Sequence, residues 1–231
     1  MAEDWAEDGP VATREPVLGD VRTPWGALLT VDVNDHSHRE PFLTTGVSWI
    51  EEAFRRAVWT RPGFRVVDVG ASYGYLSSLF AHCVGPGGEV IAFEPTTGSF
   101  ELLRANMSRN HPREVRCRRI AISDHDGEET IYLDSEYLAC HSVVPNISPS
   151  PSGSYERVAA LTLDSALSAL GLDDDPIDLL KIDVEGAEGR VLVGAARTLR
   201  SVSRVWLEFW PDGLAAAGTD PSAVFDRHVE H

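Results

Sequence analysis

Two groups of residues in this sequence could do chemistry, a glycine-bearing turn with acidic neighbours and a later set of carboxylates. Asp68, Gly70 and Gly74 belong to the turn, which follows an apolar, β-branched run. The glycines let the backbone turn sharply and let a ligand approach without an intervening side chain. Asp68 would repel a phosphate, and Ala71 and Ser72 stand where a dinucleotide site needs its middle glycine. The turn therefore predicts a cationic ligand that carries no phosphate.

Glu94 adds a second carboxylate to this group, because it directly follows the apolar run 89–93. A neighbouring parallel strand would place Glu94 beside the turn, where it can bind both hydroxyls of a ribose. Sulfonium and ammonium groups are stabilised by such anionic surroundings. A site for S-adenosylmethionine is therefore predicted at Asp68, Gly70, Gly74 and Glu94. The alternative is a glycine turn that serves only the fold.

Asp183, Glu185 and Glu208 make up the second group, and each lies at or just after the end of a predicted strand. When a methyl group is transferred to a hydroxyl or a protonated amine, a positioned carboxylate or histidine can accept the proton, typically worth about 10²–10⁴ in rate. His141 is a fourth candidate base, with a solvated loop histidine as the alternative. For Glu185 the alternative is an acidic residue that stabilises the start of a helix predicted over 185–200. Three carboxylates could also hold Mg²⁺, but their spacing does not demand it, so no metal is predicted.

Strand and helix patterns alternate around these residues. The first strand is followed by a helical stripe of Leu76, Leu79, Phe80 and Cys83, and a second stripe consists of Phe100, Leu103 and Met107. Further strand patterns occur at 115–122, 129–133, 158–163 and 205–210. This alternation predicts an α/β protein with a mostly parallel, doubly wound sheet flanked by helices.

Four segments, in this order, carry a resemblance to a known family: Asp68–Gly74, Phe93–Pro95, Ala121–Asp124 and Lys181–Glu188. Over roughly residues 45–210 the chain resembles the FkbM-type class I methyltransferases, which have a Rossmann-like fold and use S-adenosylmethionine. The resemblance implies that Gly70, Ser72 and Gly74 line the methionine end of the cofactor. It also implies that Glu94 holds the ribose, Ser123 lies near the adenine and Asp183 lies beside the reacting centre. Family members commonly have asparagine in place of Ser72, and a serine can still form a hydrogen bond there.

The sequence divides into three predicted parts. Residues 1–20 are acidic and interrupted by prolines, which is typical of a disordered segment. Residues 21–60 are predicted to form a cover, with a hairpin around Pro24–Gly26 and an amphipathic helix marked by Val47, Ile50, Phe54 and Val58. The methyltransferase domain is predicted to occupy residues 61–231.

Two segments differ from an ordinary domain of this class. Residues 135–157 are too long and polar for a simple connection, so they form either a lid or a disordered loop, and we favour the lid. Only 21 residues follow Trp210, too few for the usual C-terminal hairpin, so the sheet is expected to lack it. The strand at 205–210 would then be an open edge that invites pairing with a second chain. This edge predicts a homodimer.

Composition limits the possible partners. The 231 residues include 36 acidic and 20 basic ones, and the net charge of −16 disfavours a phosphate backbone or an anionic membrane surface. A basic run at 113–119 alternates with apolar residues, as a solvated strand face does. We expect a cytoplasmic protein, since no secretory signal and no apolar run of about 18 residues is present. The three cysteines, Cys83, Cys117 and Cys140, are expected to be reduced thiols.

The resemblance implies a tailoring methyltransferase that uses S-adenosylmethionine. Its predicted acceptor is a hydroxyl or an amine of a small natural product, a sugar or aminosugar in secondary metabolite biosynthesis. The negative charge favours a cationic, aminoglycoside-like acceptor, and no nucleic acid or membrane partner is expected. Two alternatives stay open. One is a non-catalytic module that binds S-adenosylmethionine, and the other is an NAD-linked oxidoreductase, which would need the missing middle glycine.

Overall fold

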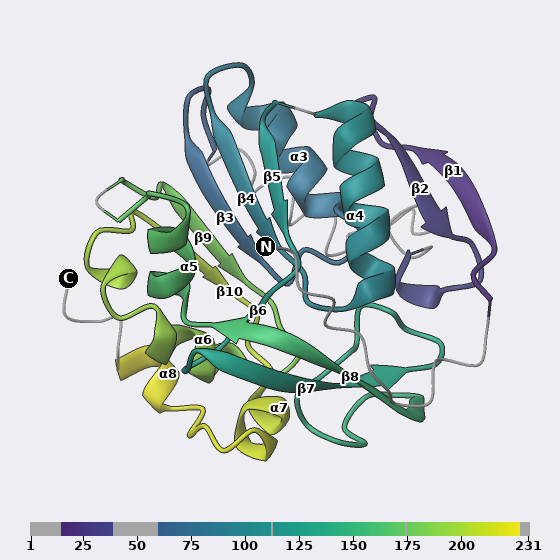
Figure 1. Ribbon diagram of the computed structural model, residues 1–231, viewed down its shortest axis with the longest axis vertical. Coiled ribbons are helices and arrows are strands. Elements are labelled where there is room, and N and C mark those ends of the chain that lie inside the picture. The colour runs from purple at the N-terminus through teal and green to yellow at the C-terminus, as the bar shows by residue number, and fades with distance from the viewer. Residues whose placement is uncertain (1–14, 39–59, 112, 174, 227–231) are drawn as a thin grey trace.

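The computed structural model describes residues 15–38, 60–111, 113–173 and 175–226, and its centre is a parallel β-sheet (Figure 1). The strands lie in the order β10, β9, β3, β4, β5. They span β3 Arg65–Val69, β4 Glu89–Phe93, β5 Val115–Arg118, β9 Leu179–Ile182 and β10 Val205–Leu207. The helices are α3 Tyr75–Val84, α4 Thr97–Asn110, α5 Leu163–Ala169, α6 Glu188–Gly194, α7 Pro211–Ala216 and α8 Ala223–Asp226, with a 3₁₀ turn, η1, at Thr198–Arg200. The predicted α/β class is confirmed.

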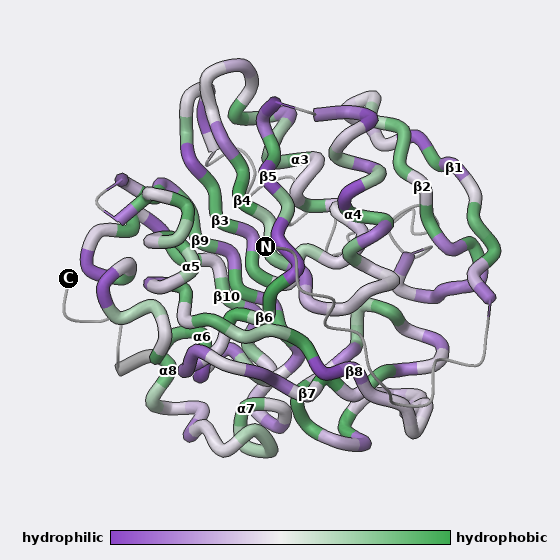
Figure 2. The backbone as a smooth tube through the Cα atoms, viewed as in Figure 1, coloured by the Kyte–Doolittle hydropathy of each residue, from purple (hydrophilic) through white to green (hydrophobic). Residues whose placement is uncertain are grey.

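Alternate residues of the central strands face opposite sides of the sheet and build two apolar cores. Val66 and Val90 pack with α3 and α4 on one side, whereas Val67 and Ile91 pack with α5 and α6 on the other. Figure 2 shows these strands as the hydrophobic centre of the molecule. Because both faces are covered, the strands appear in the sequence as nearly continuous apolar runs, which is why they could be predicted. The sheet is doubly wound, as expected.

The strand order reverses between β3 and β9, because the chain runs outward through β4 and β5 and then crosses back. In open α/β sheets, ligands bind at the carboxyl ends of the strands beside such a reversal. Here the turns after β3 and β9 touch. A Cβ atom on Gly70 would lie 1.8 Å from the main-chain oxygen of Asp183, and Gly70 has a φ of 78°. Only glycine fits this contact, which brings the glycine turn against Asp183.

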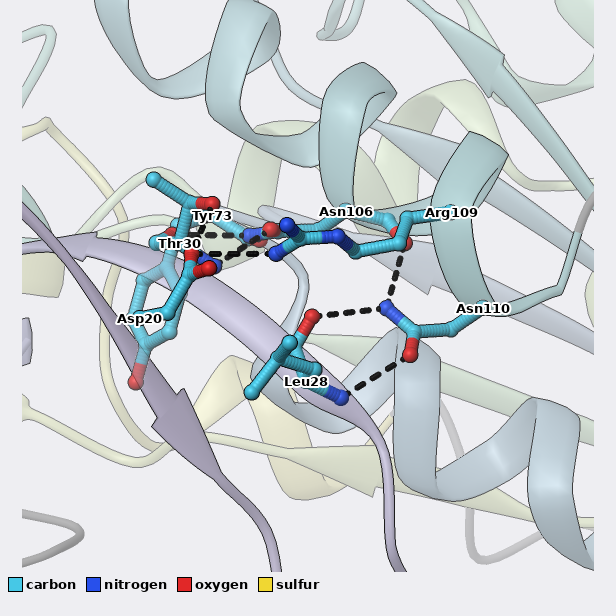
Figure 3. Close-up of polar contacts among 7 residues, drawn as sticks. All are labelled: Asp20, Leu28, Thr30, Tyr73, Asn106, Arg109 and Asn110. Atoms are coloured by element: carbon cyan, nitrogen blue, oxygen red, sulfur yellow. Dashed lines mark hydrogen bonds and ion pairs between the residues drawn. The ribbon is translucent and has the colours of Figure 1, made fainter.

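A hairpin near the N-terminus packs on α4. Its strands are β1 Leu18–Arg22 and β2 Leu28–Asp32. Figure 3 shows that Thr30 N–H donates to Oδ1 of Asn106 at 2.7 Å while Nδ2 of Asn106 donates back to Thr30 O at 3.0 Å. Asn110 pairs with Leu28 in the same way, at 2.9 Å in both directions. Nδ2 of Asn106 also donates to Tyr73 O at 2.8 Å, so α4 joins the hairpin to the glycine turn.

A smaller sheet lies beyond the carboxyl ends of the parallel strands, in the order β6, β8, β7 (Figure 1). Its strands are β6 Ala121–Ile122, β7 Gly127–Asp134 and β8 Pro151–Leu161. The single strand predicted at 115–122 is therefore wrong, because β5 belongs to the main sheet and β6 pairs with β8. The predicted lid is also shorter than 135–157, since β8 begins at Pro151.

The helix predicted over 185–200 is wrong at both ends. Glu185 and Gly186 have φ angles of 55° and 100°, in the left-handed region, and a right-handed helix cannot include them. Helix α6 begins at Glu188 and is followed after Gly194 by η1. The first-turn acidic position of this helix is thus Glu188, and Glu185 is not available for that role.

The structure describes only part of the two predicted N-terminal segments, residues 1–20 and 21–60. Strand β1 begins at Leu18, so regular structure starts before residue 21, the predicted edge of the cover. The predicted amphipathic helix at Val47–Val58 and residues 1–14 lie outside the described residues. Among the described residues the main sheet ends at β10, without a C-terminal hairpin. None of their helices has both the length and the apolar character needed to span a membrane.

Candidate functional site

A cavity lies at the carboxyl ends of β3, β4 and β9, where the strand order reverses. The glycine turn, the end of β4, β6, β7 and the segment 138–143 form its walls. The predicted site residues on these walls are Gly70, Ser72, Glu94, Ser123, His141, Asp183 and Glu185. Asp68, Gly74 and Glu208 are not among the lining residues.

Glu94 lies in the cavity, where main-chain and side-chain groups orient its carboxylate. Ser72 N–H donates to Oε2 at 3.0 Å, and the N–H and hydroxyl of Thr96 donate to Oε1 at 3.1 Å and 2.7 Å. Burial raises the pKa of Glu94, and the hydrogen bonds from Thr96 and Ser72 oppose that shift. A carboxylate can accept about four hydrogen bonds, so Oε2 keeps capacity toward a hydroxyl in the cavity.

Ser72 points to a ligand through its hydroxyl. It has a left-handed φ of 49°, and its Oγ is buried without a hydrogen-bond partner among the described residues. A buried polar group left unpaired costs about 1–3 kcal/mol, which a polar group of a bound ligand can recover. The position of Ser72, next to Glu94, fits the predicted methionine and ribose end of the cofactor.

Asp68 and Gly74 serve the fold rather than the cavity, contrary to the sequence-based expectation. Asp68 is fully buried, accepts a hydrogen bond from Ser77 Oγ at 2.6 Å and pairs with Lys181 Nζ at 3.1 Å. Its charge is therefore compensated inside the protein and is not offered to a ligand. A Cβ atom on Gly74 would lie 2.8 Å from side-chain atoms of both Leu103 and Met107, so this glycine allows the turn to pack on α4.

The cavity also has apolar walls and a further lining carboxylate, that of Glu129. The apolar walls include Phe93, Ile122 and Ile131. Glu129 Oε2 accepts hydrogen bonds from Ser123 Oγ at 3.2 Å and from Arg190 Nη1 at 3.1 Å. An apolar slot with a hydrogen-bond acceptor suits a purine base that carries an amino group.

The sequence analysis did not identify Glu129 as a site residue, although the alternation of residues along β7 could have indicated it. Glu129, Ile131 and Leu133 alternate along β7, and the two apolar residues are buried. Side chains two apart on a strand share a face, so an acidic residue in this register faces inward.

Three carboxylates converge beside the cavity, as the strand-end argument predicted. Asp183 and Glu185 follow β9 and Glu208 follows the neighbouring β10, and one carboxylate oxygen of each lies within 4.8 Å of the others. Burial, then the charge of Asp183, raises the pKa of Glu185 to about 8. Burial and the charges of Asp183 and Glu185 raise the pKa of Glu208 well above its ordinary value. These three carboxylates can bind an organic cation or exchange a proton. Their oxygens could also hold a divalent metal, although the sequence analysis predicted no metal.

His141 lines the cavity, but its geometry does not suit a base. Asp134 N–H donates to His141 Nδ1 at 3.0 Å, so the neutral ring carries its proton on Nε2. Burial lowers the pKa of His141 to about 4, which keeps the ring neutral. His141 can therefore donate a hydrogen bond from Nε2, whereas Nδ1 already accepts the hydrogen bond from Asp134 N–H. The predicted role as proton acceptor does not fit this arrangement.

The segment 135–150 covers the cavity and is fixed at several points, which fits a lid. Leu138, Ala139 and Val143 line the cavity from it. Leu138 N–H donates to Asp35 Oδ2 at 2.7 Å, and Ala139 N–H donates to Ser37 Oγ at 3.2 Å. Further along, Ser142 Oγ donates to Glu185 O at 2.7 Å.

Replacing Glu185 with glutamine is expected to raise Tm by about 2–4 °C at pH 8 and by less at pH 5.5. In a domain of this size, such a shift corresponds to a gain of about 1 kcal/mol in the free energy of unfolding. The pKa of Glu185 is about 8 in the folded chain against an ordinary 4.5, so between these values only the folded state holds the proton. Stability therefore falls as pH rises through this range, and glutamine avoids that loss. Partial exposure of Glu185 limits the size of the effect.

Melting curves of the wild type and the Glu185→Gln variant at both pH values test this. Glu101→Gln, on the exposed side of α4, serves as a matched control. An equal gain at pH 5.5 and pH 8 would contradict the assigned pKa.

Comparison with known proteins gives consistent matches. The model of the methyltransferase FkbM domain family matches residues 68–217. The 31-O-demethyl-FK506 methyltransferase FkbM of Streptomyces tacrolimicus is 34% identical over 170 residues, which cover 61% of this chain and 62% of that protein. The AMB antimetabolite synthetase AmbE of Pseudomonas aeruginosa is 30% identical over 218 residues, 78% of this chain and 10% of the synthetase.

Among solved structures, a SAM-dependent O-methyltransferase from Thermotoga maritima aligns with a TM-score of 0.45 and 14% identity. The alignment covers 86% of this chain and 59% of that one. This chain thus spans less than two thirds of each of these three proteins.

Proposed function

The chain belongs to the FkbM methyltransferase family, and from this premise we propose that it methylates a hydroxyl or an amine of a small, positively charged natural product. Its cofactor is S-adenosylmethionine. The proposed acceptor is a sugar or aminosugar of secondary metabolism. The observation that carries this proposal is the group of Asp183, Glu185 and Glu208 beside the cavity.

The electrostatics of these carboxylates support a cationic acceptor. Glu185 and Glu208 have raised pKa values because they are buried beside other carboxyl groups. An ammonium group placed among them would favour the ionised forms and replace the protons. The net charge of −16 adds a long-range attraction for such a molecule. The name of the FkbM relative describes transfer to an oxygen, which supports a hydroxyl as the methylated group.

The proposed mechanism assigns each side chain a separate task. Bound S-adenosylmethionine supplies a methyl group made electrophilic by the adjacent sulfonium. Glu94 and Ser72 would orient the ribose and methionine end, and Glu129 and Ser123 would accept or donate hydrogen bonds at the base. Asp183 would accept the proton that the acceptor loses. Leu138 and Val143 would exclude water from the reacting groups.

Transfer of labelled methyl groups to matched acceptors tests this proposal. An aminoglycoside and its fully N-acetylated form have the same hydroxyls and differ in positive charge. We expect kcat/KM to be at least 10-fold higher for the charged form, since the acetylated form loses its ionic contacts. Fragmentation of the product by mass spectrometry then distinguishes O-methylation from N-methylation.

Equal rates with both acceptors would overturn the preference for a cation. Tight binding of S-adenosylmethionine without transfer to any acceptor tested would instead favour the non-catalytic binding module.

A further inference from the structure

Lys181 is the one lysine in a chain of 231 residues, and it is buried, with 2% of its surface exposed, in contact with two residues that line the cavity, Gly70 and Asp183. Its Nζ donates to Gly70 O at 2.6 Å and lies 3.4 Å from Val69 O. The same atom pairs with Asp68 Oδ1 at 3.1 Å and with Asp183 Oδ2 at 3.5 Å. One ammonium group thus joins the end of β3, the glycine turn and the end of β9.

The charge of Lys181 is balanced by nearby acidic groups. Burial alone would lower the pKa of Lys181, but Asp68, Asp183 and Glu208 outweigh burial and raise it above its ordinary value. Lys181 in turn offsets part of the rise that burial causes in the pKa values of Glu94 and Glu185. The ammonium is thus in contact with the carboxylates of Asp68 in β3 and Asp183 after β9.

The chemistry of lysine explains why arginine does not stand here. An ammonium is a compact point charge with three donors that can point in different directions, whereas a guanidinium is a flat fork suited to one planar partner. The contacts of Lys181 with Gly70 O, Asp68 and Asp183 lie on separate elements. A planar group could not serve all of them within this buried space.

We propose that Lys181 is a positioning residue for methyl transfer. It holds the carbonyl of Gly70 inward, which keeps the glycine turn open for the methionine end of the cofactor, and its contact with Oδ2 of Asp183 aims that carboxylate at the reacting centre. This inference rests on methyl transfer from S-adenosylmethionine and does not depend on the identity of the acceptor.

Binding of S-adenosylhomocysteine by calorimetry tests the proposal in two variants. Lys181→Met removes the ammonium but leaves Asp68 buried without its ion pair, so this variant is expected to be unstable. Asp68→Asn combined with Lys181→Met removes both charges and is expected to recover a Tm within a few degrees of the wild type. In the double variant we still expect affinity to fall at least 10-fold, because Gly70 O and Asp183 remain without their donor.

The pH dependence of binding separates positioning from a purely structural role. Without the ammonium, Glu94 and Glu185 should protonate at higher pH, because the charge of Lys181 no longer lowers their pKa values. The pH below which affinity is lost should therefore rise by at least half a unit. A double variant that regains wild-type affinity and an unchanged pH profile would overturn the proposal. So would a stable double variant whose affinity falls without any shift of the profile.

The single lysine also allows a direct observation in the unaltered protein. Lysine-selective isotope labelling gives one side-chain signal in NMR spectra. We expect that signal to shift when S-adenosylhomocysteine is added, and the absence of any shift at saturating ligand would contradict contact between Lys181 and the cofactor turn.

Discussion

Replacing Asp183 with asparagine is expected to lower kcat for methyl transfer by roughly 10²–10⁴-fold, the contribution typical of a positioned proton acceptor. Asp183 lines the cavity at the strand reversal, and its main chain contacts the glycine turn at Gly70. Asparagine keeps the size of the side chain but cannot accept the proton. The affinity for S-adenosylhomocysteine should change much less than kcat, because Glu94 and Ser72 still orient the rest of the cofactor.

Single-turnover and steady-state rates with labelled S-adenosylmethionine measure this effect. Asp20→Asn, on the exposed hairpin strand β1, is a suitable control, because it removes a surface ion pair with Arg109 far from the cavity. A loss of cofactor affinity equal to the loss of kcat would show that Asp183 binds the cofactor rather than accepting the proton.

Replacing Glu94 with alanine is expected to weaken binding of S-adenosylmethionine and S-adenosylhomocysteine by about 1.5–3 kcal/mol, which is about 10- to 150-fold. Glu94 is 7% exposed, and its carboxylate is fixed by Ser72 and Thr96 before any ligand arrives. Because the acceptor atom is already oriented, little ordering accompanies the new hydrogen bond. Calorimetric titration of both ligands measures the change.

Glu94→Gln makes this test sharper. Glutamine keeps the volume and one carbonyl acceptor, so its affinity should lie between those of the wild type and Glu94→Ala. Equal affinities for all three chains would mean that the ribose is held elsewhere, and the assignment of this end of the cavity would then be wrong.

Sequence alone predicted the parts of this fold that depend on local pattern. The strand, glycine turn and helix around Gly70 are contiguous, and so is the buried run of β4, so periodicity was sufficient to find them. The convergence of Asp183, Glu185 and Glu208 also followed, because parallel strands place their carboxyl ends at one edge.

The remaining features depend on contacts between distant residues. Asp68 was assigned to the ligand because its ion-pair partner, Lys181, lies far along the chain. Lys181 also donates a hydrogen bond to Gly70 O, across 111 positions of the sequence. Glu185 was placed in a helix because an acidic residue before an apolar stripe resembles a helix start. In the structure its backbone is left-handed, and the next residue, Gly186, packs closely against the main chain of Gly213. No local pattern contains such information.

The anchored segment over the cavity has a consequence for turnover. Leu138, Ala139 and Ser142 hold it through hydrogen bonds to the hairpin side and to the turn after β9. Each such bond is worth about 0.5–1.5 kcal/mol net, and the segment lines the cavity in which the cofactor is proposed to bind. We therefore expect release of the product, rather than bond making, to be the slow step of each cycle. An initial burst of methylated product, followed by a slower steady state, would indicate that release is slow, as these three hydrogen bonds lead us to expect.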